Sequence, residues 1–374
     1  MAPGCGPFAD DGGHVSQTHR RGVLLVNLGT PEGTKPSQVR RYLRQFLNDP
    51  RVIDINPVGK WLLLNLVILP FRPKQSAEAY QQIWTERGSP LLFHSQDLCA
   101  GLQAAAPEFE FELAMRYGSP SIQAGLDVLR QKGCDQIVIF PLYPHYASSS
   151  TGSSIQAVYD ALSEEWNTPA ISIVPPFYDH DAFIGAFRDV AAPVLAADES
   201  DFVLFSFHSL PERHITKSDP SGWCRMGQGG CCDSMNEKNQ FCYRAQCEET
   251  ARRLAKALNL EEDAWSVAYQ SRLTRDPWLT PNAEAVIEDL AKKGIRRVAV
   301  MCPAFVADCL ETLEEIAMRG AEIFEEHGGE LLTLVPSLNA HPSWICAAAT
   351  LVRSAAGDIP PQRALSHETG PDLV

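Results

Sequence analysis

The segment GVLLVNL, residues 22–28, is a continuous apolar run that ends at Gly29, which is typical of a strand buried on both faces of a parallel sheet. Residues 37–47 follow it and predict a helix whose apolar face comprises Val39, Tyr42, Leu43 and Phe46. The same succession of strand and helix returns along the chain. Further strands are predicted at residues 111–115, 136–140, 171–174, 202–207, 266–269, 297–301 and 331–335, and further helices at 121–131, 181–196, 247–258, 283–293 and 310–326. Repeated strand–helix units predict an α/β fold with parallel sheets that helices cover on both faces.

The length of 374 residues indicates two domains, because a domain commonly has about 150 residues. Eight strands could form one large sheet or two sheets of four, and the segment PPFY at 175–178 favours two domains with a hinge there. We therefore expect two similar doubly wound domains, each with a mostly four-stranded parallel sheet. The expected divisions are a disordered N-terminus at 1–20, domains at 21–176 and 177–340, a helix at 341–354 that packs back on the body, and a flexible tail at 355–374.

The charge balance of 32 basic against 46 acidic residues, a net charge of −14, argues against nucleic acid as a partner because phosphate binding needs a basic surface. The first twenty residues contain no apolar core of a secretory signal, so we expect a cytoplasmic, reducing location. The longest apolar run, WLLLNLVILPF at residues 61–71, is shorter than the ~20 residues of a membrane span. We expect a buried helix or a hydrophobic flap there. The alternative is an exposed lip at a pocket mouth that touches a membrane.

Ligands of parallel α/β sheets bind beyond the carboxyl ends of the strands, and two groups of ionisable residues lie at such ends. His208 directly follows the strand at 202–207, where an imidazole could act as a general base or could merely bond a loop. Asp308, Glu311 and Glu315 follow another predicted strand with the helical spacing i, i+3 and i+7. A carboxylate row could hold a cation or relay protons, although acidic residues are also common in the first turn of a helix. Nucleotide binding has no motif support, since the chain contains neither a Walker loop nor G-x-G-x-x-G.

Five of the eleven cysteines gather within 24 residues in the pattern C-x6-C-C-x9-C-x4-C: Cys224, Cys231, Cys232, Cys242 and Cys247. Clustered thiolates in a reducing compartment indicate an iron–sulfur cluster or a zinc site rather than disulfides. The lack of the short C-x2-C pair that is common in zinc sites favours iron–sulfur. We expect most of the other six cysteines to be small core residues.

Aromatic residues recur at the predicted strand ends, as core side chains or as the lining of a flat apolar pocket: Tyr117, Tyr143, Tyr146, Trp278 and Phe305. Eight blocks of sequence lie in or beside these loops: VLLVNLGTP at 23–31, GSP at 88–90, RYGSP at 116–120, PLYP at 141–144, HSLPER at 208–213, YQSR at 269–272, PWL at 277–279 and DCLETL at 308–313. In these blocks and in their order the chain resembles the ferrochelatase family. The resemblance implies a chelatase-like fold of two similar α/β domains around a porphyrin cleft. It also implies a lyase that inserts ferrous iron into protoporphyrin or coproporphyrin to make haem.

The resemblance assigns roles to the candidate residues. It implies that His208 accepts a pyrrole proton or ligates iron, that Glu311 is its carboxylate partner, and that Asp308 and Glu315 continue a path for metal or protons. It further implies a porphyrin lining of Leu28, Tyr80, Ser89, Arg116, Tyr117, Trp278 and Phe305, with Arg116 pairing a propionate. Cys309 stands at a position where animal members of the family have histidine. Many bacterial members also have cysteine there. The run at 61–71 falls in the lip region of the family, which leaves peripheral membrane contact as one expectation.

Relative to the family, residues 221–241 form an insert that brings most of the clustered cysteines. The resemblance to bacterial members with an internal cluster implies a [2Fe–2S] centre on Cys224, Cys231, Cys232 and Cys242, with Cys247 as alternate and zinc as the alternative metal. An animal-type cluster is excluded, because Ser148 occupies the internal ligand position and the C-terminal region has only Cys346. Two other functions remain open: a cobaltochelatase of the same fold, and a porphyrin- or haem-binding sensor of iron or redox state. The sequence is compatible with a monomer or a homodimer.

Overall fold

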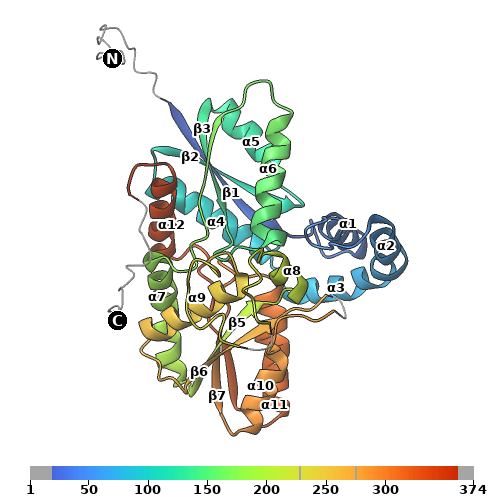
Figure 1. Ribbon diagram of the computed structural model, residues 1–374, viewed down its shortest axis with the longest axis vertical. Coiled ribbons are helices and arrows are strands. Elements are labelled where there is room, and N and C mark those ends of the chain that lie inside the picture. The colour runs from blue at the N-terminus through green and yellow to red at the C-terminus, as the bar shows by residue number, and fades with distance from the viewer. Residues whose placement is uncertain (1–18, 227–228, 274–275, 361–374) are drawn as a thin grey trace.

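The computed structural model describes residues 19–226, 229–273 and 276–360, and within them all eight predicted strands are confirmed. The strands are β1 (Arg20–Gly29), β2 (Phe109–Tyr117), β3 (Cys134–Pro141), β4 (Ala170–Ile173), β5 (Phe202–His208), β6 (Trp265–Gln270), β7 (Arg297–Met301) and β8 (Leu331–Leu334). They form two four-stranded sheets, and every pairing in both sheets is parallel. The sheets lie one above the other in Figure 1, each with helices at its faces.

The two sheets repeat the same strand order, β2-β1-β3-β4 in the first and β6-β5-β7-β8 in the second. β1 is therefore equivalent to β5, and β3 to β7. The flanking segments repeat as well: a π-helical segment follows each of β3 and β7, and the helix after β2 or β6 begins at a side-chain cap, Ser121 or Asn282. Central strands are buried on both faces because helices cover both sides of each sheet, as the continuous apolar runs predict.

The predicted helices are present in the described residues. The helices are α1 (Pro36–Leu47), α2 (Pro57–Leu62), α3 (Leu69–Ile83), α4 (Pro90–Ala105), α5 (Ile122–Gln131), α6 (Ser153–Ser163), α7 (Asp181–Asp198), α8 (Glu212–Lys217), α9 (Tyr243–Ala257), α10 (Ala283–Lys292), α11 (Ala321–Glu326) and α12 (Pro342–Ala355). Helix α9 begins four residues before its predicted start, and helices α2, α3, α4, α6 and α8 occur in addition to the predicted ones. Three π-helical segments join them: η1 (Leu63–Ile68), η2 (Ser148–Gly152) and η3 (Glu311–Gly320). The predicted helix at 310–326 is thus π-helical over its first ten residues, because apolar spacing does not report which carbonyl each N–H bonds.

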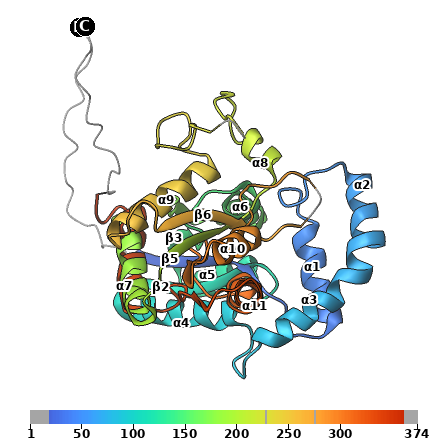
Figure 2. The ribbon, with the colours of Figure 1, turned by 90° about the horizontal axis from the view of Figure 1, so that it is seen from below.

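Helices α1 to α3 stand to one side of the body, as Figure 2 shows from below. The apolar run at 61–71 lies on this projection and is buried on one side only. Leu64, Ile68 and Leu69 are buried, whereas Trp61, Leu66 and Phe71 are 60%, 59% and 74% exposed. No helix in the described part of the chain has both the length and the apolar character that a membrane span requires.

Phe177, in the segment at 175–178, is packed into the core. Phe177 is buried and its ring lies 5.6 Å from that of Phe140 in β3 and 5.7 Å from that of Trp344 in α12. Helix α12 itself packs against α4 and α7. The last helix of the chain therefore joins elements that belong to both halves of the sequence.

Candidate active site

A cavity of about 300 Å³ opens at the carboxyl ends of the strands, lined by residues from both halves of the chain. The first half contributes the end of β1, the loop after β3 and side chains of α1 and α3. The second contributes the end of β5 and the loop that joins β7 to η3. This is the position that the parallel topology predicts for a ligand site. Most of the lining is apolar or aromatic, as suits a flat apolar ligand.

His208 is the last residue of β5 and lines the cavity. Its Nδ1 lies 2.6 Å from the backbone carbonyl oxygen of Ser209. Because a carbonyl oxygen only accepts, Nδ1 donates this bond, and the neutral ring then carries its lone pair on Nε2. The ring is held on its other side by Phe305, whose centroid is 6.2 Å away. The arrangement presents one basic nitrogen in a fixed orientation.

Glu311 is the first residue of η3 and also lines the cavity. Its backbone carbonyl accepts a hydrogen bond of 2.7 Å from the Gln270 side chain, which ties η3 to the end of β6. Burial, and after it the charge of the Glu311 carboxylate, raises the pKa of Tyr80 and of Cys309 well above their usual values. Tyr80 and Cys309 therefore stay protonated at neutral pH beside Glu311 in the cavity wall.

The other two carboxylates of the predicted row lie outside the cavity lining. Asp308 is buried and accepts hydrogen bonds from Thr312 (3.1 Å) and Asn339 (2.7 Å). Glu315 accepts bonds from the backbone N–H (2.8 Å) and the hydroxyl (2.5 Å) of Ser271. Both carboxylates brace the loops that carry the site, and of the three only Glu311 reaches the cavity.

Five of the residues assigned to the porphyrin line the cavity, and two do not. The lining includes Leu28, Tyr80, Ser89, Trp278 and Phe305. Arg116 and Tyr117 lie outside it and bind Asp49 instead, with distances of 2.7 Å from the guanidinium and 2.8 Å from the phenol to the same carboxylate oxygen. Arg116 also donates to Ser153 at 2.7 Å, so its guanidinium is committed within the first half of the chain.

Several lining residues were not anticipated. They are the cations Arg72 and Arg272, and His145, His214 and Tyr243. Arg272 and His145 fall in loops that follow β6 and β3, so their place after a predicted strand was an available signal. His145 is 2% exposed, and burial lowers its pKa to about 3, which keeps this imidazole neutral. His214 lies 3.0 Å from Asp54. Burial raises the pKa of the Asp54 carboxyl, but its hydrogen bonds to side chains of α8 outweigh this effect and lower the pKa.

The thiols of the insert gather at the start of α9. Cys231 and Cys232 are buried against Ala245, their sulfurs 3.8 Å apart, and the Cys232 thiol hydrogen-bonds Cys242. That bond, together with backbone N–H groups of α9, lowers the pKa of Cys242 to about 6. Over residues 19–226, 229–273 and 276–360, no group of three or more His, Cys, Asp or Glu side chains is arranged so that it could hold a metal ion. Cys247 is fully buried, away from solvent.

Comparisons with known proteins agree with this geometry. The family model described as ferrochelatase matches residues 20–356. The chain is 45% identical over 334 residues to a ferrochelatase of Legionella pneumophila (strain Lens), covering 89% of this chain and 98% of that protein. It is 42% identical over 343 residues to a ferrochelatase of Coxiella burnetii (strain CbuG_Q212), covering 91% and 95%.

Among solved structures, SirB from Bacillus subtilis with Fe³⁺ has a similar fold. It superposes with a TM-score of 0.51 at 13% identity and covers 91% of this chain and 96% of that one. A likeness at this identity concerns the fold alone. The family match and the curated relatives, in contrast, span nearly all of the described residues, and they do not favour the cobaltochelatase or sensor alternatives. The chain therefore belongs to the ferrochelatase family, the enzymes that insert ferrous iron into a porphyrin to make haem.

Proposed function

We propose that the porphyrin occupies the cavity between the two sheets and that His208 and Glu311 carry out the exchange of two pyrrole protons for one ferrous ion. The observation that supports this most is that a histidine with a free Nε2 and a carboxylate line one apolar cavity. Insertion requires groups that accept protons or bind Fe²⁺, and imidazole and carboxylate do both. As the two N–H protons leave, the porphyrin dianion neutralises the charge of the incoming iron.

The apolar lining holds the macrocycle and excludes water. Phe305 and Trp278 offer ring faces from the second half of the chain, and Leu28 offers an apolar contact from the end of β1. We assign the propionates to Arg72 and Arg272, because they line the cavity while the Arg116 guanidinium binds Asp49. Propionate pairing at the mouth would leave the macrocycle, with its central pyrrole nitrogens, in the apolar interior of the cavity.

The test of this function is direct. Purified protein with Fe²⁺ under anaerobic conditions should convert a dicarboxylate porphyrin to haem, followed by the change in the visible spectrum. Parallel assays with protoporphyrin and coproporphyrin identify the substrate, since the two share one macrocycle and differ only in their side chains. Porphyrin binding without metal insertion, by either substrate, would contradict the proposal and support a sensor. Faster insertion of Co²⁺ into a more carboxylated tetrapyrrole would support a cobaltochelatase.

We also propose a [2Fe–2S] centre in the insert, on Cys224, Cys231, Cys232 and Cys242. Three of these sulfurs already gather at the start of α9, and the hydrogen bond from Cys232 lowers the pKa of Cys242, which favours the thiolate form that ligates metal. Cys224 belongs to the same group, since burial and then the Cys242 thiol raise its pKa to about 11. Cys247 is the weaker candidate because it is fully buried and hydrogen-bonded to Tyr243. When bound, such a centre would supply thiolate cross-links and one-electron chemistry.

The cluster proposal predicts a brown protein when purification excludes air, with iron and acid-labile sulfide in equal amounts. Cys231→Ser should lose the colour, because a hydroxyl is a poor ligand for this metal centre. Cys346→Ser is the matched control, since Cys346 is an exposed cysteine on α12 and should leave the spectrum unchanged. A colourless protein that contains stoichiometric zinc would contradict the iron–sulfur assignment and support the alternative metal.

We further propose that the exposed face of α2 to α3 contacts an anionic lipid surface. Its apolar side chains are Trp61, Leu62, Leu66, Val67 and Phe71, and the exposed cations Arg72 and Lys74 follow directly. Apolar side chains beside basic ones are typical of helices that lie in a membrane interface. Arg72 also lines the cavity, so this surface borders its mouth.

The lipid proposal predicts that the protein floats with vesicles that contain anionic phospholipid and less well with zwitterionic ones. Trp61→Ser combined with Phe71→Ser should reduce flotation by about tenfold or more, since each exposed aromatic side chain contributes on the order of 1–2 kcal/mol when buried. Trp166→Ser is the control, because Trp166 is 97% exposed and lies far along the chain, before β4. Equal flotation of all three proteins would contradict the assignment.

A further inference from the structure

Tyr243 connects the cysteine insert to the catalytic strand. It is the first residue of α9, directly after Cys242, and its side chain is 7% exposed. The Tyr243 hydroxyl donates a hydrogen bond of 2.8 Å to the backbone carbonyl oxygen of His208. Its ring lines the cavity. One side chain therefore touches the residue that carries the proposed chemistry and begins the helix on which the thiols gather.

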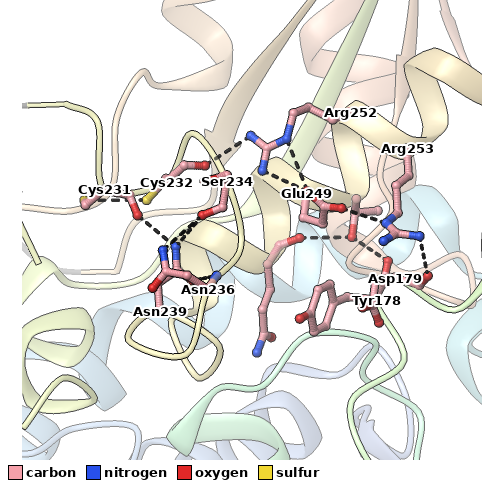
Figure 3. A network of polar contacts seen from close by, with 12 residues as sticks. Tyr178, Asp179, Cys231, Cys232, Ser234, Asn236, Asn239, Glu249, Arg252 and Arg253 are labelled. Carbon is pink, nitrogen blue, oxygen red and sulfur yellow. Dashed lines mark hydrogen bonds and ion pairs between the residues drawn. The ribbon is translucent and has the colours of Figure 1, made fainter. Parts of the chain in front are cut away.

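The insert is hydrogen-bonded to α9 at two places. Gln246, in the first turn of α9, donates to the Gln240 carbonyl at 2.7 Å, and Arg252, in the second half of α9, donates to the carbonyl oxygen of Cys232 at 3.1 Å. Within the insert, Asn239 donates to the carbonyl oxygen of Cys231 at 2.9 Å, as Figure 3 shows. A change in the arrangement of the thiols therefore acts on α9 through Gln246 and Arg252.

The same helix also contacts the first half of the chain. The side-chain oxygen of Gln246 accepts a bond of 2.7 Å from the backbone N–H of Tyr146, in the loop after β3 that lines the cavity. Thr250, one turn further on, lies 2.9 Å from Nε2 of His145. Helix α9 thus bonds the insert, the His208 backbone and the opposite wall of the cavity.

We infer that Tyr243 is a positioning residue through which the cysteine insert and the porphyrin cavity influence each other. The Tyr243 hydroxyl bonds the carbonyl oxygen of the peptide that joins His208 to Ser209. The next carbonyl along the chain, that of Ser209, accepts the hydrogen bond that orients the His208 imidazole. Rearrangement of the thiols at the start of α9 moves this hydroxyl. Since coupling between two sites is reciprocal, porphyrin binding changes the insert as much as the insert changes the site. The inference rests on the proposed role of His208.

The experiment uses the purified protein with whatever its insert holds. Hydrogen–deuterium exchange is measured with and without protoporphyrin, in the absence of added iron, for wild type and Tyr243→Phe. In wild type, porphyrin should slow exchange in the insert peptides at 221–242. In Tyr243→Phe, porphyrin should still protect the cavity loops but leave the insert unchanged, because the ring remains and only the hydroxyl is lost.

Kinetics give the second readout. Tyr243→Phe should lower kcat about fivefold, the value of one hydrogen bond, with the porphyrin KM nearly unchanged. Tyr178→Phe is the matched control: its ring also packs on His145, 6.2 Å away, but it lies outside the cavity lining, and it should behave as wild type. An insert that responds to porphyrin equally in Tyr243→Phe, or an unchanged kcat, would overturn the inference. Absence of haem formation by wild type would overturn the proposed function instead, while the exchange data would still report the coupling.

Discussion

Replacement of His208 by alanine is expected to lower kcat for haem formation by a factor on the order of 10² to 10⁴, the range in which a positioned acid–base group contributes. The fixed tautomer explains why the effect should be large. With Nδ1 bonded to Ser209, Nε2 presents its lone pair without rearrangement, and alanine removes both the base and the potential iron ligand. The measurement is steady-state haem formation with Fe²⁺ under anaerobic conditions.

The control for His208 is another histidine with a similar backbone contact. His327 lies 2.8 Å from the carbonyl oxygen of Ile323, outside the cavity lining, and His327→Ala should retain the wild-type kcat. Porphyrin binding by His208→Ala, followed by quenching of porphyrin fluorescence, should persist because the apolar lining is intact. Wild-type turnover by His208→Ala would contradict its assignment.

Glu311→Gln is expected to lower kcat by about 10² or more, with an increase in the KM for Fe²⁺. The amide keeps the shape of the side chain but neither accepts a proton nor carries the charge that attracts a cation. The fold should be preserved, since the contact that ties η3 to β6 runs through the Glu311 backbone carbonyl rather than its carboxylate. The thermal unfolding midpoint, measured beside kinetics, separates loss of chemistry from loss of structure.

Glu314→Gln provides the matched control in the same π-helical segment. Glu314 lies three residues further on and outside the cavity lining, so the same isosteric change should leave kcat within about twofold of wild type. If Glu311→Gln and Glu314→Gln reduced kcat equally, the effect would lie in the helix rather than in the carboxylate, and the assignment of Glu311 would be wrong.

The strands were predictable because each is a short apolar run, which is continuously buried in the central strands β1, β3, β5 and β7, and the residue after such a run lies at the ligand edge of the sheet. That reasoning led to His208 from the end of β5 alone. Position after a strand did not predict Arg72. This residue lies on α3, which reaches the cavity from the side projection and directly follows η1 rather than a strand. Position relative to a strand therefore predicts only the residues that the sheets themselves carry.

For other candidate residues, hydrogen-bond partners distant in the sequence determine whether the side chain reaches the cavity. The resemblance implies that Arg116 pairs a propionate, yet its guanidinium binds Asp49, 67 residues earlier in the chain. Asp308 and Glu315 share a helical spacing with Glu311, yet Asn339 and Ser271 bind their carboxylates. Spacing can place side chains on a common face, but it does not reveal which distant donors have already satisfied them.

The repeated strand order separates the cavity into two walls of different character. At the carboxyl ends of the equivalent strands, β1 places Leu28 and its last residue Gly29 in the cavity lining, whereas β5 places His208 there, so one strand end offers an apolar contact and the other an imidazole. Each wall is anchored in its own sheet. Substitutions that tailor the enzyme to the rim substituents of a tetrapyrrole can therefore arise at Arg72 in the first half and at Arg272 in the second without altering His208 or Glu311. A fold built by gene duplication in this way would allow substrate recognition to change while the catalytic residues stay the same.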